Sequence, residues 1–84
     1  MKRNTLDKQV LEYKNFGHIK IKLDAILNKK NITTYELSNK ADIRFQTIKK
    51  LREADEVTRI NLDVIAKLCY VLDCSVEDLL EYKK

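Results

Sequence analysis

The side chains best suited to contact another molecule lie in the range 40–52, where five residues are basic and only Asp42 is acidic. Arg44, Gln46 and Lys50 place cationic and amide groups on one short segment. Arg and Lys can donate to guanine O6 and N7, and Gln can pair with adenine N6 and N7. This chemistry suits a nucleic acid, although a run of charges can also be only a solvated helix surface. The secondary structure that carries these charges distinguishes a nucleic-acid contact from a solvated helix surface.

Two short helices are predicted to position these side chains. Thr33 and Glu36 form a capping-box pattern, in which the hydroxyl and the carboxylate each accept from the other residue's backbone N–H. We expect one helix over 34–41 and a second over 44–52. Because only two or three residues separate them, the helices must cross sharply. Their contact is expected to use small and apolar side chains: Leu37, Ser38, Ala41, Ile43, Ile48 and Leu51.

With that face buried, the second helix points five side chains outward: Arg44, Phe45, Gln46, Lys49 and Lys50. Phe45 lies beside the apolar stripe at helical spacing, so we expect it to be partly exposed. Its ring can touch the methyl group of thymine. The start of the preceding helix, at Thr34 and Tyr35, offers free backbone N–H groups to a phosphate.

The remaining chain supplies short supporting elements. The alternation in 18–23 predicts a strand, although Leu23 also begins a helical pattern, so a strand followed by a helix from Leu23 fits both. The best candidate partner for that strand is 80–82. Asn61 is a plausible N-cap, and Ser75 with Asp78 forms a second capping box. Residues 1–17 are expected to form an N-terminal arm or an extra helix, without an assigned function.

Composition limits the other classes of function. The net charge is +4 and the pI about 9.1, with four acidic and no basic residues over 73–81, so we expect a basic side and an acidic side. No apolar run is long enough to span a bilayer, which favours the cytoplasm. Cys69 and Cys74 are expected to be reduced core residues, because five-residue spacing on one helix separates them and no companion ligand is near. We find no catalytic signature, and expect no enzyme activity, metal, cofactor or small-molecule substrate.

Residues 34–53 resemble the helix-turn-helix of the Cro/C1-type (Xre) family of repressors, at the apolar and small positions named above. The segment 68–80 is similar to the family's fourth and fifth helices, and 18–23 with the ending Leu-Leu-Glu-Tyr is similar to a compact subgroup. The resemblance covers roughly residues 18–82, so we assign 18–84 to this domain. The combined spacing is more specific than any one motif.

The resemblance implies an all-α, five-helix, lambda-repressor-like domain, to which we add the short pairing of 18–23 with 80–82. It implies a sequence-specific regulator that places its third helix in the major groove of an operator. We also expect a homodimer, because one short helix reads only a few base pairs and two half-sites multiply specificity. The positions that match base contacts are Arg44, Phe45, Gln46 and Lys50, flanked by Lys49. Those that match phosphate contacts are Thr34, Tyr35, Thr47, Lys40, Arg52 and Arg59.

Two positions and one loop depart from the family's pattern. Asp42 replaces the usual Gly of the turn, although Asp tolerates left-handed backbone better than most residues. Arg44 replaces a capping Ser or Thr and cannot cap. The acidic loop 53–56 would repel phosphate, so it should swing away or contact protein, which weakens the case for Arg59. This loop and the apolar N-terminal arm support an alternative, a protein-interaction module on the same scaffold, antitoxin-like or polymerase-associated.

Overall fold

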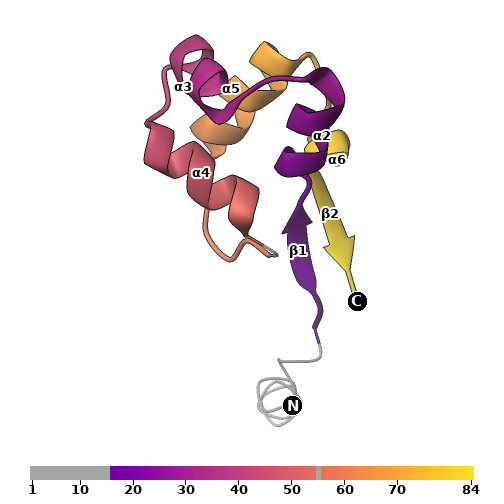
Figure 1. The fold of residues 1–84 in the computed structure, drawn as a ribbon. Coiled ribbons are helices and arrows are strands. Elements are labelled where there is room, and N and C mark those ends of the chain that lie inside the picture. The colour runs from indigo at the N-terminus through magenta and orange to yellow at the C-terminus, as the bar shows by residue number, and fades with distance from the viewer. Residues whose placement is uncertain (1–15, 55) are drawn as a thin grey trace, which may run out of the picture.

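The computed structural model describes residues 16–54 and 56–84 (Figure 1). This part of the chain is mostly helical, with a small two-stranded antiparallel sheet. In chain order its elements are β1 (His18–Ile21), α2 (Leu23–Lys30), α3 (Thr34–Ala41), α4 (Phe45–Glu53), α5 (Leu62–Leu72), α6 (Val76–Leu79) and β2 (Leu80–Lys83). The predicted arm or extra helix over 1–17 lies, except for its last two residues, outside the described residues.

The two strands join the two ends of the domain. In β1 and β2, His18 lies opposite Lys83 and Ile21 lies opposite Leu80. The predicted pairing is therefore confirmed, and α2 begins at Leu23 as expected. The described residues are mostly helical but include this two-stranded sheet, so the term all-α is slightly loose. Gly17 precedes β1 at a φ of 94°, where a Cβ would lie 2.5 Å from the carbonyl oxygen of Lys83. Glycine lets the two backbones approach there.

Side-chain caps fix where three of the helices begin. The Thr33 hydroxyl accepts from the Glu36 N–H at 3.0 Å, and the Glu36 carboxylate accepts from the Thr33 N–H at 2.9 Å. This second bond is the main reason that the pKa of Glu36 lies below its ordinary value. Ser75 and Asp78 form the second box, and Asn61 caps α5 through the N–H of Asp63. All three predicted caps are confirmed.

Every helix in the described residues contributes to one core. Its largest fully buried side chains are Leu23, Leu27, Leu37, Ile48, Leu68, Leu72 and Leu79. Burial of each such side chain stabilises a fold by about 1.5–3 kcal/mol relative to exposure. The apolar stripes thus hold the short helices, each too short to be stable alone, at fixed angles. None of these helices is long and apolar enough to cross a membrane.

The two cysteines lie closer together than helical spacing implied. Helix α5 ends at Asp73 in left-handed backbone, which folds Cys74 back so that its N–H donates to the Cys69 carbonyl at 3.0 Å. Both thiols are free, half-buried and packed against the core. Burial, with Cys69 as a neighbour, raises the pKa of the Cys74 thiol. Both cysteines pack against the core, as predicted. The separation expected on a continuous helix does not apply, because α5 ends before Cys74.

Candidate nucleic-acid interface

A tight turn joins α3 to α4 and sets their crossing. Asp42 adopts left-handed backbone, with φ 54° and ψ 48°, and its N–H donates to the Ser38 carbonyl. The Ile43 N–H donates to the same carbonyl at 3.1 Å. Asp therefore fills the position expected for Gly. Arg44 precedes α4 in extended backbone and makes no side-chain cap, so α4 begins one residue later than predicted and ends at Glu53.

The contact between α3 and α4 uses the predicted side chains. Leu37, Ser38 and Ala41 are buried on α3, and Ile48 is buried on α4. Ile43 and Leu51 are partly buried against the same cluster. The Ser38 hydroxyl donates to the Tyr35 carbonyl at 2.8 Å, which satisfies a buried polar group. Hence α4 is anchored by one face only.

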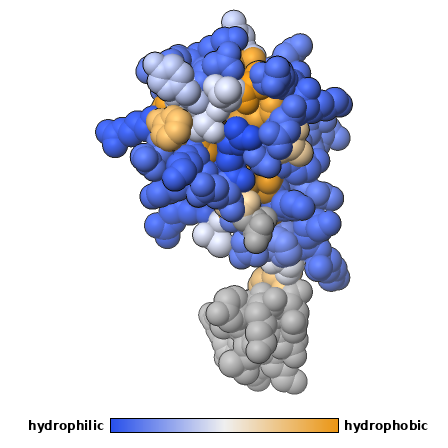
Figure 2. Space-filling model, in the orientation of Figure 1, coloured by the Kyte–Doolittle hydropathy of each residue, from blue (hydrophilic) through white to orange (hydrophobic). Residues whose placement is uncertain are grey.

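The opposite face of α4 is exposed and polar. Arg44, Gln46 and Lys50 are exposed, and no hydrogen bond or ion pair joins their side chains to other described residues. Lys49 lies 3.9 Å from Glu53, a partly exposed pair that holds it loosely. Phe45 is 43% exposed, in agreement with the partial exposure expected for it. Figure 2 shows that the face of the molecule containing this region is largely hydrophilic.

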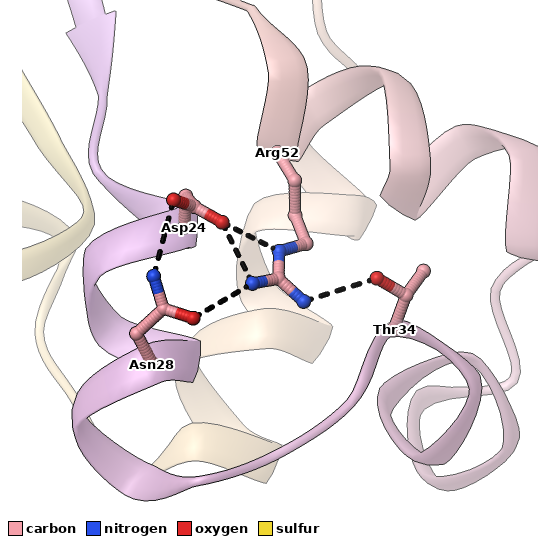
Figure 3. Close-up of polar contacts among 4 residues, drawn as sticks. All are labelled: Asp24, Asn28, Thr34 and Arg52. Carbon is pink, nitrogen blue, oxygen red and sulfur yellow. Dashed lines mark hydrogen bonds and ion pairs between the residues drawn. The ribbon is translucent and has the colours of Figure 1, made fainter.

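Arg52 lies on the same helix but has a different role. Its guanidinium donates to Asp24 from Nε at 2.8 Å and contacts the same carboxylate from Nη2 at 2.7 Å. It also donates to the Thr34 hydroxyl at 3.1 Å and to the Asn28 side-chain oxygen at 3.0 Å (Figure 3). Its side chain is only 19% exposed. Arg52 therefore links α4 to helices α2 and α3, and its predicted contact with a phosphate stays a prediction.

Sequence reasoning missed Asp24 and Asn28 as partners of this arginine. They lie four residues apart on one face of α2, and the Asn28 amide donates to the Asp24 carboxylate at 3.2 Å. That spacing is visible in the sequence and marks two polar side chains as neighbours. It does not show that α4 passes beside them, because this depends on how α2 and α4 pack.

The other predicted phosphate contacts are spread over α3 and α4. Tyr35 is 66% exposed in the first turn of α3, Lys40 is exposed at its end, and Thr47 is half-buried. The Thr34 hydroxyl accepts from Arg52, but its backbone N–H and that of Tyr35 lie in the first helical turn, where no intrahelical partner exists. These two N–H groups can therefore donate hydrogen bonds to a bound anion.

The acidic loop turns towards β1, as expected for a loop that contacts protein. Glu56 lies 3.9 Å from Nδ1 of His18, and the Val57 N–H donates to the Ile19 carbonyl at 2.8 Å. Residue 55 is outside the described residues. Arg59 and the rest of the segment 57–60 line an open cavity of about 560 Å³ together with Ile19 of β1 and residues of β2. Arg59 is thus grouped with β1 and β2 rather than with the exposed face of α4.

The chain belongs to the family of Cro/C1-type helix-turn-helix DNA-binding domains, whose model matches residues 22–84. Helices α3 and α4 are its helix-turn-helix pair, and the protein is a DNA-binding regulator of that type. The match begins at Lys22, so β1 lies outside it. No curated protein matches the chain.

Proposed function

We propose that this protein is a sequence-specific transcriptional regulator of the cytoplasm that binds double-stranded DNA as a homodimer and inserts α4 into the major groove. One observation carries the proposal: Arg44, Gln46 and Lys50 project from a helix whose other face is anchored in the core. A fixed helix with free polar side chains can present them to base edges without first breaking internal bonds.

The division of contacts follows from where the side chains lie. Arg44 and Lys50 would bond guanine, Gln46 would bond adenine, and Phe45 would touch a thymine methyl, with Lys49 flanking. The backbone at Thr34 and Tyr35 would hold a phosphate beside the groove, and we assign Lys40 and Thr47 to the phosphates as well. Such contacts fix the position of the helix but do not read sequence.

A dimer is proposed because one short helix reads only a few base pairs. Two half-sites multiply specificity, and their centres would lie roughly 34–36 Å apart, about one turn of the duplex. A two-part operator would then mirror the two-fold symmetry of the protein.

A comparison of Gln46→Ala with Lys40→Ala tests the proposed register. After selection of the preferred site from a random duplex pool, Gln46→Ala should relax preference at one base pair by about 1–3 kcal/mol. Lys40→Ala should weaken binding to all sequences about equally and lower the salt slope by about one. If Gln46→Ala left every base preference intact, the register assigned to α4 would be wrong.

The alternative, a protein-interaction module, is supported by the acidic loop and the open cavity beside it. A gel shift with random duplex DNA at low salt separates the two functions. A DNA-binding domain must bind there because counterion release favours binding at low salt. Absence of binding at low salt would overturn the DNA-binding proposal and favour the module.

A further inference from the structure

The two edges of the small sheet differ. In an antiparallel pair, residues alternate between those whose backbone groups bond the partner strand and those whose groups point away. The Lys22 N–H donates to the Leu79 carbonyl at 2.7 Å, so Lys20 with Glu81 is the next bonded pair. Ile19 and its partner Tyr82 therefore point their backbone groups outward. The Val57 N–H covers the Ile19 carbonyl on the β1 side.

The β2 edge has no such cover from the described residues. The Leu80 N–H is used by the Val76 carbonyl at the end of α6. No backbone bond from the described chain reaches the N–H or carbonyl of Tyr82, or the carbonyl of Leu80. An edge strand with unpaired backbone groups is a template for another strand.

We propose that β2 of a second copy of this chain pairs antiparallel with this edge, so that the sheet continues through both copies. The backbone of Tyr82 would exchange both hydrogen bonds with the partner's Tyr82 on the two-fold axis. Glu81 would then lie directly opposite the partner's Lys83, and Lys83 opposite the partner's Glu81. The order of strands becomes β1, β2, the partner's β2 and the partner's β1.

Charge selects this register among the symmetric ones. The backbone N–H and carbonyl groups that point away from β1 belong to the even-numbered residues of β2. Any other symmetric register must therefore still pair even-numbered residues of one copy with even-numbered residues of the other. A slip in one direction places Glu81 against the partner's Glu81, and a slip in the other places Lys83 against the partner's Lys83. Like charges directly opposite are destabilising, whereas Glu81 with the partner's Lys83 is favourable and occurs twice. These positions form the non-bonded pairs, in which side chains lie closest.

The side chains on the other face of the sheet fit the same arrangement. Tyr82 is 59% exposed and Ile19 is 38% exposed on the face that lines the open cavity. Pairing would place the Tyr82 rings of the two copies side by side and cover part of this apolar surface. Since the helices lie at one end of the strands (Figure 1), the two helical bodies would lie at opposite ends of the four-stranded sheet.

The pairing should be weak in the absence of DNA. Stable interfaces bury roughly 1,200–2,000 Å² in total, and an edge of four residues buries less. We therefore expect self-association at high protein concentration. The inference deepens the homodimer of the proposed function, but it is measured without DNA, so its failure and that of DNA binding are distinguishable.

A charge exchange between copies tests the register. Glu81→Lys and Lys83→Glu should each weaken self-association of the full chain about tenfold in sedimentation equilibrium, because each places like charges in both cross-strand pairs. An equimolar mixture of the two variants should regain wild-type association, since every pair is then opposite in charge. Within each copy, residue 81 still faces Lys20 and residue 83 still faces His18, so the mixture corrects only the contact between copies.

Tyr82→Pro gives an independent test at the same edge. It removes an N–H that points away from β1, so the β1–β2 bonds remain, while pairing with a second copy is blocked. Tyr82→Val is the matched control, because it also removes the ring and the hydroxyl bond to the Phe16 carbonyl but keeps the N–H. Circular dichroism checks that each variant is folded. A wild-type protein that is monomeric up to about 1 mM, a mixture no stronger than its components, or Tyr82→Pro equal to Tyr82→Val would each overturn the proposal.

Discussion

An arginine lies at each end of α4, and the two side chains have opposite surroundings. Arg44, at the start, is exposed and makes no internal bond to the described residues. Arg52, at the end, is four-fifths buried and bonds Asp24, Asn28 and Thr34. The two arginines lie within nine residues of one another, and each counts as one positive charge in the composition. A charge is available to a ligand only where the fold leaves it without partners.

The same difference distinguishes a side chain that can contact DNA bases from one that fixes the orientation of α4. A free guanidinium at the first turn can form two bonds to a guanine edge. A guanidinium held by three side chains would have to break those bonds before it could contact a base, whereas a free one would not. We therefore assign Arg52 to the orientation of α4 and Arg44 to base contact.

The largest effect is expected for DNA binding by Arg44→Ala. Loss of a base contact should weaken binding to the selected site by about 10- to 100-fold. The free energy of unfolding should change by less than about 0.5 kcal/mol, since the side chain touches nothing internal. Fluorescence anisotropy and urea unfolding measure the two quantities. Equal affinity for wild type and variant would remove Arg44 from the reading face.

The next effect is expected for stability in Arg52→Ala. The variant leaves Asp24 without its cation and unties α4 from two helices, so the free energy of unfolding should fall by about 1–2 kcal/mol. Arg52→Lys should recover only part of this, because one ammonium cannot reach all three partners with the geometry of a guanidinium. Urea unfolding at neutral pH checks both variants. If Arg52→Ala were as stable as Arg44→Ala, the tie would not hold the helix.

The smallest effect is expected for the pH dependence of stability, through the Glu36 carboxylate in the capping box. Its pKa is lower in the folded state, so the unfolded chain binds more protons as the pH falls through the carboxyl range. Its contribution to stability is thus present above the ordinary carboxyl pKa and is lost as the pH falls through the folded pKa. Glu36→Gln keeps the capping geometry but cannot titrate.

Thermal unfolding between acid and neutral pH measures this effect. The acid loss of stability should be shallower for Glu36→Gln than for wild type. Asp78→Asn alters the second capping box, where the Ser75 N–H lowers the pKa of Asp78, and should flatten the curve by a further step. Superimposable curves for wild type and both variants would show that the boxes do not contribute to acid unfolding.

Local chemistry made much of the fold predictable. The capping box at Thr33, the N-cap at Asn61 and the alternation before Leu23 each depend on neighbours within a few residues, and the structure confirms all three. The exposed and buried faces of α4 followed from helical spacing for the same reason. The partners of Arg52 depend on how separate helices pack, which spacing along one helix does not encode. The approach of Cys74 to Cys69 depends on where α5 ends, because the left-handed backbone at Asp73 interrupts the helical spacing.

The tie at Arg52 has a mechanical consequence. Helix α4 is held at its start by the tight turn after Asp42 and at its end by Asp24 and Thr34. If α4 enters the major groove as we propose, a helix held at both ends resists reorientation, so adjustment to an irregular groove would come mainly from bending and twisting of the duplex. Pyrimidine–purine steps deform most easily, and their placement between contacted bases would favour some operators over others without any side chain touching them.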